Sequence, residues 1–374
     1  MSHATKVFLF DGLRDANLFQ RIIGGDLAQV NLASAAILDS RLIAAIDGGL
    51  PMMVPSKAAQ IDGVVVSSMS EDQAARLAFY YAALGCLPGT QVIMHAMRLI
   101  TVRTYIRRYC ADLAGADWQL QCAVELHVSV ARDVMAQYSH LSVEQLALSR
   151  QRIYARAHSA QRAAAAPSRY VGSQMPVQAV RTFGTRAPYR GFVSVEEHDL
   201  SFPKFDGTHS KSVTRAALVS SDAAIVMPYD PITDRVLLIE QFRAGPHVRG
   251  DSQPWCLEPI AGLIDAGEAP EQAALREAKE EAGLEIRHLE MISQTYPSPG
   301  LSTEFFYLYV GLVALPEVSN VISGLASESE DIRSHVFAFD AFMRLIDAGQ
   351  FSVGPTVLAG LWLSRHRDRL RALA

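Results

Sequence analysis

The stretch that most constrains the fold of this chain is GLIDAGEAPEQAALREAKEEAGL, residues 262–284. Pro270 suits the first turn of a helix, because that turn needs no N–H donor, and Gly283 suits a helix end, because glycine accepts left-handed backbone angles. Small side chains recur every four residues between them: Ala274, Ala278 and Ala282. This spacing predicts a narrow helical face that can lie close against a sheet. The stretch therefore predicts a helix of an α/β domain.

The same helix carries carboxylates on a different face. Glu277 and Glu281 lie four residues apart, and like charges at this spacing destabilise an isolated helix by roughly 0.2–0.5 kcal/mol. We expect Arg276 to relieve only part of this repulsion. A bound divalent cation reverses its sign, because Mg²⁺ prefers hard oxygen ligands and keeps waters and substrate phosphate in its other positions. A solvated acidic helix is the alternative interpretation.

Length and composition limit the class of protein. The chain of 374 residues favours two domains. With 49% hydrophobic and 20% charged residues it has the profile of a folded soluble protein, and a net charge of −5 argues against a nucleic-acid partner. No apolar run is long enough for a membrane span, and the first residues lack a signal-peptide layout, so we expect a cytoplasmic protein without a membrane partner. The cysteines show no CxxC spacing and so indicate neither a zinc site nor a disulfide framework: Cys86, Cys110, Cys122 and Cys256.

Strand and helix patterns divide the chain. In the first half, KVFLF, GVVVSS and QVIMHAM are strand-like, and capping boxes start one helix at Ser70 and another at Ser142, which we expect to run through ARAHSAQRAAAA. The Pro-, Gly- and Ser-containing residues 167–185 predict a linker. The second half alternates strands with helices and ends in two helices. We therefore predict domains at 1–166 and 186–374.

Seven residues around the acidic helix match the Nudix signature, G-x5-E-x7-R-E-U-x-E-E-x-G-U with U a bulky apolar residue, at every spacing: Gly262, Glu268, Arg276, Glu277, Glu280, Glu281 and Gly283. Ala278 is small for the first U position, whereas Leu284 satisfies the second. The resemblance implies a Nudix hydrolase with an α/β/α sandwich built on a mixed sheet. It also implies that water attacks phosphorus while Mg²⁺, or Mn²⁺ as the alternative metal, neutralises phosphate charge.

The flanks of this signature resemble ADP-ribose pyrophosphatases over roughly residues 186–374. The upstream segment from PYRGF to EQFRAG is similar almost element by element, WCLEPIAG adjoins the signature, and SPG and GLASESED follow it. The resemblance implies hydrolysis of ADP-ribose to AMP and ribose 5-phosphate by a homodimer that associates through the Nudix domain. The alternatives are another nucleotide sugar or dinucleotide as substrate, or a regulator that senses such a ligand without turnover.

The same resemblance implies a role for each site residue. The Ala261 carbonyl, Glu277, Glu281 and Glu330 would bind the metal, and Glu328 on the acidic loop would act as general base. Arg276 would orient the glutamates of the signature, Glu280 among them. The substrate-binding positions carried over from the family are Arg215, Arg243, Glu258, Phe192 and Pro299.

Three residues near these motifs either depart from the family pattern or have an ordinary structural interpretation. Ala216 stands where relatives often have glutamate, which removes one expected ribose or adenine contact. We expect Trp255 to lie in the core rather than to stack on substrate. Glu304 suits either a metal bound to phosphate or an ordinary strand start.

The first half resembles γ-glutamylcyclotransferase-like (AIG2-like) domains, through VFLFDGLRDANLFQRIIGGDL and the segment from MVPSKAAQ to YYAALG. The resemblance covers roughly residues 5–125 and implies a β-barrel with helices, in a fusion like those of bacterial tellurite-resistance-type proteins. Asp11 replaces the usual glycine of the first turn, and Tyr81 stands where the family has its catalytic glutamate. Cyclotransfer then lacks its acid/base. We therefore expect an inactive scaffold, with Asp11 a turn residue and Tyr80 and Tyr81 helix-packing residues.

Overall fold

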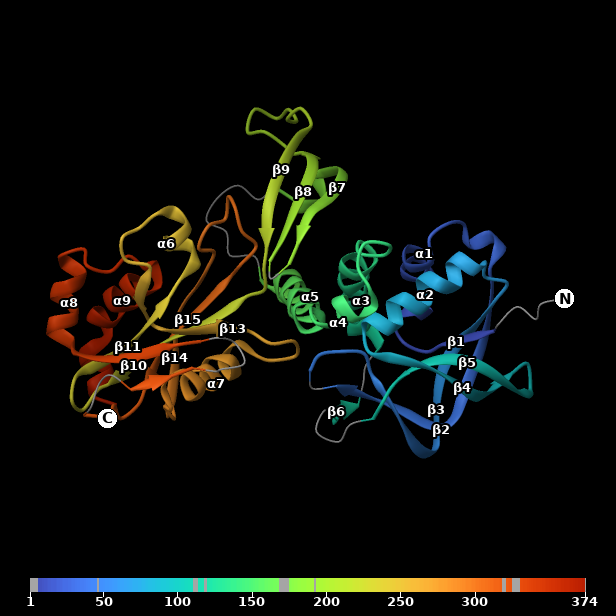
Figure 1. The fold of residues 1–374 in the computed structure, drawn as a ribbon, viewed down its shortest axis with the longest axis horizontal. Coiled ribbons are helices and arrows are strands. Elements are labelled where there is room, and N and C mark those ends of the chain that lie inside the picture. The colour runs from blue at the N-terminus through green and yellow to red at the C-terminus, as the bar shows by residue number, and fades with distance from the viewer. Residues whose placement is uncertain are drawn as a thin grey trace. The chain divides into compact units, whose positions relative to one another are not determined.

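The chain is mixed α/β and forms two compact units (Figure 1). The computed structural model describes residues 6–45, 47–109, 114–117, 120–167, 175–191, 193–317, 321–324 and 330–373. Unit 1 comprises Met1–Ala216 with Asp265–Gly267, and unit 2 comprises Ala217–Ile264 with Glu268–Ala374. No helix within the described ranges is long and apolar enough to cross a membrane.

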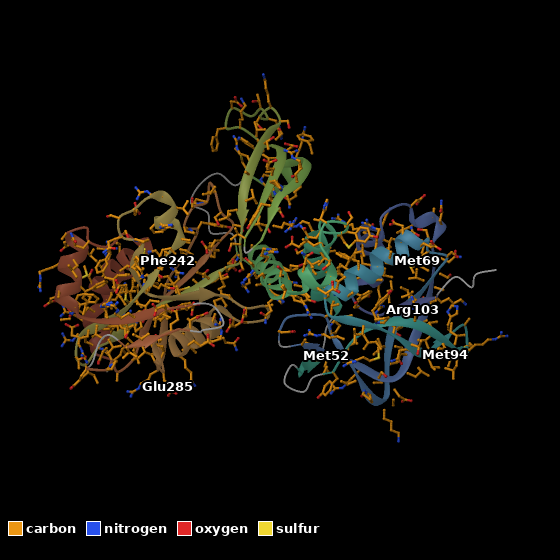
Figure 2. The ribbon with its side chains drawn as sticks, in the orientation of Figure 1. Met52, Met69, Met94, Arg103, Phe242 and Glu285 are labelled. Carbon is orange, nitrogen blue, oxygen red and sulfur yellow. The ribbon has the colours of Figure 1, made fainter. Side chains whose placement is uncertain are left out.

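Unit 1 contains a six-stranded sheet in the order β1-β3-β5-β4-β2-β6, with β1 also pairing β5 and β3 also pairing β2. KVFLF and QVIMHAM are confirmed as parts of strands, and GVVVSS forms most of the last part of a longer strand that begins at the buried Met52 (Figure 2). The strands are β1 (Val7–Leu9), β2 (Asn31–Ala45), β3 (Met52–Ser67), β4 (Cys86–His95), β5 (Arg98–Arg107) and β6 (Ala114–Asp117).

The helices of unit 1 begin where their capping residues predict. Ser70 and Gln73 form the capping box of α2, and Ser142 and Gln145 form that of α4. The single helix expected from Ser142 is instead two helices, because the backbone of Ser149 (φ −101°, ψ 3°) leaves helical geometry. The elements are η1 (Gly12–Arg14), α1 (Ala16–Ile23), η2 (Leu27–Gln29), α2 (Glu71–Ala83), α3 (Leu120–Met135), α4 (Val143–Ala147), α5 (Arg150–Ala165) and η4 (Val177–Ala179).

A second, three-stranded sheet follows in the order β7-β8-β9, comprising β7 (Arg181–Arg190), β8 (Ser194–Ser201) and β9 (Val213–Val219). Buried charges join β7 to the helices of unit 1: Asp133 on α3 accepts from Arg156 on α5 at 2.9 Å and from Arg190 on β7 at 2.8 Å. Arg190 also lies 3.6 Å from Glu196 on β8, which is 2% exposed. The predicted domain ranges, with a linker at 167–185, stay a prediction.

Unit 2 is built on an eight-stranded mixed sheet whose main path is β14-β15-β10-β11-β17-β16, with β12 pairing β11 and β13 pairing β10. The central strand β10 pairs β15 in parallel and β11 and β13 antiparallel. The strands are β10 (Ala223–Asp230), β11 (Arg235–Phe242), β12 (Trp255–Glu258), β13 (Ile260–Leu263), β14 (His288–Thr295), β15 (Phe306–Leu312), β16 (Ile322–Ser323) and β17 (Ile332–Ala338).

Helices cover both faces of this sheet. Successive side chains of a strand point to opposite faces. Accordingly Val226 packs in one core with Ala274 and Ala278 of α7 (Pro270–Ala282), whereas Ile225 packs in another with Phe342 of α8 (Phe339–Asp347) and with α9 (Gly354–Arg371). This arrangement explains why every residue of β10 is buried. The short helix α6 (Ala244–Arg249) follows β11.

Candidate active site

The acidic helix α7 begins and ends at the predicted residues. Pro270 is its first residue, and Gly283 ends it with a left-handed backbone (φ 63°) while its N–H donates to the Lys279 carbonyl. Near the start, the carboxylate of Glu271 accepts a hydrogen bond from the Tyr309 hydroxyl at 3.0 Å. Both ends of α7 are therefore held, which gives the carboxylates along it a defined direction.

Arg276 on α7 bonds more carboxylates than the sequence predicts. Its Nε and Nη2 donate to the two oxygens of Glu268, each at 2.9 Å, and Nη2 also donates to the Leu263 carbonyl at 3.2 Å. Its Nη1 donates to Glu277 at 2.6 Å and to Glu280 at 3.1 Å. The expectation that Arg276 relieves only part of the repulsion stays a prediction, and the charge of Glu277 still raises the pKa of Glu281.

Gly262 on β13 is required by the position of Glu277. A Cβ atom on Gly262 would lie 1.8 Å from the Glu277 Oε1 atom and 2.1 Å from its Cδ atom. Any larger residue would push this carboxylate away from the strand. The glycine of the signature thus allows α7 to lay a carboxylate directly on β13.

Glu281 is the most buried carboxylate of the helix, with 2% of its surface exposed. The Ala261 N–H donates to its Oε2 atom at 3.2 Å. Burial, with the nearby charges of Glu277 and Glu330, raises the pKa of Glu281 to about 9. Burial also raises the pKa of Glu277 to about 7, against the opposing effect of Arg276. The site therefore holds both carboxyl groups where burial disfavours their charged forms, a cost that a bound cation would offset.

These residues fit a hard divalent cation. All of the donors are oxygen atoms, and Mg²⁺ is usually bound by one or two carboxylates, with waters and substrate phosphate completing its shell. Within the described residues, no three or more His, Cys, Asp or Glu side chains are arranged to hold a metal ion by themselves. The pair formed by Glu277 and Glu281, with Glu330 close enough to affect both pKa values, is thus an incomplete shell of the kind that suits Mg²⁺.

Arg243 lies beside this acidic group, immediately after β11. Its Nε donates to the Glu258 Oε1 atom at 2.7 Å, while 41% of its side chain stays exposed. Glu258 is 7% exposed, and burial raises its pKa despite the guanidinium. Arg243 also lowers the pKa values of Glu281 and the half-buried Glu304, whose pKa burial raises. An exposed cation therefore stands next to the carboxylates, as an anionic substrate would require.

The remaining predicted site residues are less closely grouped. Arg215 lies exposed on β9 in unit 1, where its Nη1 atom donates to the Thr214 carbonyl at 3.2 Å. Pro299 lies on an exposed loop before β15. Phe192 and Glu328 lie outside the described residues. Their roles, like those of the other site residues, stay predictions.

Two features of unit 2 were not expected from the sequence. Trp255 is 54% exposed and packs edge-on against Phe242 at 5.6 Å, so the expectation of a core position is wrong. Both residues lie at the ends of paired strands, Phe242 at the end of β11 and Trp255 at the start of β12. The Tyr309–Glu271 bond was not predicted, because its two partners lie 38 positions apart and neither belongs to a motif.

In unit 1, Asp11 and Tyr81 meet in the core. The Tyr81 hydroxyl lies 3.0 Å from Oδ2 and 3.2 Å from Oδ1 of Asp11, and the Leu13 N–H donates to Oδ1 at 3.0 Å. The neighbouring Tyr80 hydroxyl lies 2.9 Å from Nδ1 of His127. The turn role of Asp11 and the packing roles of both tyrosines are confirmed, and the hydrogen bond between Asp11 and Tyr81 is an addition to them.

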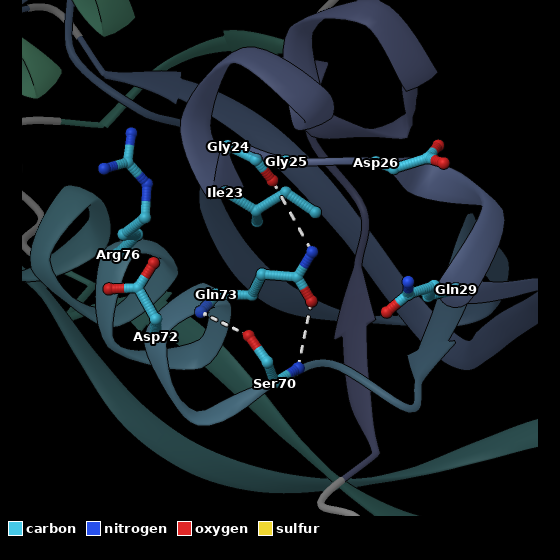
Figure 3. A pocket seen from close by; sticks show the side chains of 9 residues that line it. All are labelled: Ile23, Gly24, Gly25, Asp26, Gln29, Ser70, Asp72, Gln73 and Arg76. Atoms are coloured by element: carbon cyan, nitrogen blue, oxygen red, sulfur yellow. Dashed lines mark hydrogen bonds between the residues drawn. The ribbon is translucent and has the colours of Figure 1, made fainter.

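A surface pocket of about 410 Å³ lies at the start of α2 in unit 1 (Figure 3). Three of its polar side chains have partners nearby: Gln73 and Ser70 form the capping box, Gln73 Nε2 donates to the Gly24 carbonyl at 3.5 Å, and Arg76 Nε donates to the Ile22 carbonyl at 3.0 Å. These bonds hold α2 against α1, and we assign the pocket no ligand.

Comparison with known proteins identifies the family of unit 2. The model of the NUDIX domain matches residues 220–353. The chain is 35% identical over 196 residues to an ADP-ribose pyrophosphatase of Haemophilus influenzae, covering 52% of this chain and 90% of the relative. It is 37% identical over 183 residues to the ADP-ribose pyrophosphatase of Escherichia coli K12 (49% and 87%), and 31% identical over 137 residues to a GDP-mannose pyrophosphatase of E. coli SMS-3-5 (37% and 70%).

The matched residues include the whole of α7 and β13. The chain therefore belongs to the Nudix family and is a Nudix hydrolase. Two of the three relatives named above are ADP-ribose pyrophosphatases, and these cover more of the chain than the GDP-mannose pyrophosphatase does.

Proposed function

We propose that the protein hydrolyses the pyrophosphate of ADP-ribose to AMP and ribose 5-phosphate. The observation that carries this proposal is the buried Glu281 beside Glu277 on α7, with the partly exposed guanidinium of Arg243 close enough to lower the pKa of Glu281. A pyrophosphate with bound metal would add a cation for Glu277 and Glu281, and an anion for the part of the Arg243 guanidinium that Glu258 leaves exposed. The names of relatives that match over 87–90% of their length support ADP-ribose as the substrate.

In this proposal Glu277, Glu281, Glu330 and the Ala261 carbonyl hold Mg²⁺, or Mn²⁺. The bound metal supplies charge neutralisation on the phosphate oxygens and a more acidic water molecule. The chain itself contributes orientation: β13 carries both Ala261 and Gly262, so that one strand fixes the backbone ligand and the position of Glu277.

The other residues position substrate and protons. Arg276, bonded to Glu268, Glu277 and Glu280, holds the carboxylates of α7 in place. Arg243, held by Glu258, keeps N–H groups free for a phosphate, which a planar guanidinium can bind in a bidentate manner. We assign Glu328 as the general base. The further substrate contacts that we propose are Arg215, Phe192 and Pro299.

GDP-mannose is the second candidate substrate, since one relative is a GDP-mannose pyrophosphatase. The deciding experiment offers the metal-free full-length chain ADP-ribose, GDP-mannose, UDP-glucose and NADH, with and without Mg²⁺, and measures released phosphomonoester. We expect ADP-ribose to give the highest kcat/KM, and only with metal. Higher kcat/KM for GDP-mannose would replace the proposed substrate. No turnover of any of the four would favour a sensing role.

For unit 1 we propose a cyclotransferase-like scaffold without cyclotransferase activity. Its buried Asp11 and Tyr81 bond to each other, so the carboxylate and the hydroxyl are already used within the core. A chain that starts near Thr182 would lose Asp133, the partner of the partly buried Arg190, and Arg132, which lies 3.9 Å from Glu196. We expect that shortened chain to keep hydrolysis but to show an altered KM, stability or oligomeric state.

We also propose that the protein is a homodimer in which the strands preceding the Nudix signature take part. The strand β7 is at the edge of its sheet and has no fully buried residue, and its Phe183 and Tyr189 are 63% and 56% exposed. An exposed edge strand with aromatic side chains is a ready surface for pairing. Light scattering after size-exclusion chromatography tests this, and a monomer at assay concentration would contradict it.

A further inference from the structure

A group of polar side chains in unit 1 takes no part in the proposed hydrolysis. We call it the Arg150 cluster, and it consists of Asp47, Cys86, Arg107, Arg150 and Tyr154. These residues come from the turn before β3, the start of β4, the end of β5 and the first turns of α5. One turn, two strands and one helix that are distant in sequence thus contribute to one small region.

Two glycines let the guanidinium groups of this cluster approach the backbone closely. A Cβ atom on Gly85 would lie 2.1 Å from Nη1 of Arg150, and one on Gly49 would lie 2.4 Å from Nη1 of Arg107. The residue after Gly85 is Cys86, which is the direct cross-strand partner of Arg107 in the β4–β5 pair. Arg150 and Arg107 both lie close enough to Cys86 for their charges to act on its thiol.

Tyr154 lies close to the same two arginines. It follows Arg150 by one helical turn on α5, and residues four apart lie on the same helical face. Its Cε2 atom would lie 3.3 Å from a Cβ atom on Gly49, next to the Arg107 guanidinium. Its phenol is also close enough to the Cys86 thiol and to Arg107 for both to affect its pKa.

Arg107 has partners, whereas Arg150 and Tyr154 lack them. Arg107 Nη1 donates to Asp47 at 2.8 Å and to the Leu50 carbonyl at 3.4 Å. Among the described residues, Arg150 makes no hydrogen bond or ion pair, and its Nε is buried without a partner. Tyr154 is 3% exposed, and although the Leu50 N–H lies near its oxygen, the hydroxyl has no hydrogen-bond partner in the described structure. Buried polar groups are normally paired, so these donors indicate a missing acceptor.

The chemistry of the cluster defines that acceptor. Burial raises the pKa of the Cys86 thiol to about 12, so the thiol is neutral and does not supply the anion. Guanidinium N–H groups together with a phenol O–H are the donors that bind carboxylates and phosphates. The side chain of Asp47 is 30% exposed and Arg150 is partly exposed, so the cluster reaches solvent on one side.

We propose that the Arg150 cluster is a binding site for the carboxylate or phosphate group of a small molecule, held by the Arg150 guanidinium and the Tyr154 hydroxyl. The ion pair of Arg107 with Asp47 forms one wall of this site. The proposal does not depend on the hydrolase activity, because none of its residues belongs to unit 2.

Calorimetric titration of the metal-free full-length chain tests this site, with inorganic phosphate and L-glutamate as probes and with sodium chloride at matched ionic strength. We expect one probe to bind, and its identity decides between phosphate and carboxylate. Arg150→Gln should weaken that binding by about tenfold or more, because a charge-assisted hydrogen bond is lost. Tyr154→Phe should weaken it less. The matched control is Arg152→Gln, which removes the same charge from an exposed position of α5 and should leave the affinity unchanged.

Two further readouts make the test decisive. Phosphate can also bind near Arg243 in unit 2, so binding that survives Arg150→Gln unchanged belongs there and overturns the proposal. If neither probe binds at 10 mM, the proposal is also overturned, because a dissociation constant above about 10 mM is too weak to indicate a binding site for such a ligand. If Arg150→Gln does not fold, Tyr154→Phe remains informative. Because the hydroxyl has no partner in the described structure, this variant should melt no lower than the wild type without ligand, and a clear drop would reveal an internal partner.

Discussion

Replacing Glu281 by glutamine should stabilise the metal-free protein while removing its activity. Glutamine has nearly the same shape, and its side-chain carbonyl can still accept the Ala261 N–H. The substitution replaces an ionisable group by a neutral one at a position where only 2% of the residue is exposed and ionisation is therefore costly. Because a metal ligand is lost at the same time, stability and catalysis should change in opposite directions.

The size of this effect follows from the pKa of Glu281, which burial raises from 4.5 to about 9. Between these values the unfolded chain releases a proton that the folded protein retains. The free energy of unfolding therefore falls as the pH rises through this window, by about 1.36 kcal/mol per pH unit. At pH 7.5 the cost is on the order of 4 kcal/mol, and below pH 4.5 it disappears.

The assay is thermal unfolding of the full-length chain after removal of metal, from pH 5 to pH 8.5. For a unit of about 150 residues, 4 kcal/mol corresponds to a rise in Tm of roughly 8–16 °C near neutral pH. Glu285→Gln is the matched control, because Glu285 is exposed just after α7 (Figure 2). Saturating Mg²⁺ should stabilise the wild type and narrow the gap.

Two results would refute this reasoning. If Glu281→Gln melts no higher than the wild type at pH 8, or if the gap does not shrink toward pH 5, burial of this carboxylate does not strain the fold. If the variant keeps near-normal turnover at saturating Mg²⁺, Glu281 is not a metal ligand.

Three further outcomes are expected. Glu328→Gln should lower kcat by about 10²–10⁴-fold with KM nearly unchanged. Glu330→Gln should instead raise the Mg²⁺ concentration needed for half activity. Equal, small effects of both substitutions would show that the acidic loop is only a surface loop. Gly262→Ala should fold but lose about tenfold or more of kcat, because its Cβ atom displaces a carboxylate 1.8 Å away, while Gly245→Ala, with open space around it, should be neutral. The wild type should release no 5-oxoproline from γ-glutamyl dipeptides, and any robust release would show that Tyr81 does not disable the scaffold.

The sequence by itself determined the features that depend on neighbours along the chain. Pro270 and Gly283 set the ends of α7, and the capping boxes at Ser70 and Ser142 set the starts of two other helices, because each works through backbone groups within a few residues. The signature around α7 likewise identified the hydrolase class, since its residues lie at fixed spacings on the end of β13, the loop that follows it, and α7 with its C-terminal glycine.

Only the tertiary structure decided which of these groups are buried and which touch. Arg276 reaches the Leu263 carbonyl and Glu268 because β13 lies alongside α7, and the same packing buries Glu281 and raises its pKa. Asp11 meets Tyr81 across 70 positions of sequence, and Tyr154 is left without a partner in the described core. The physical reason is that spacing along a chain constrains neighbours, whereas burial, dielectric environment and hydrogen-bond satisfaction depend on segments brought together by folding.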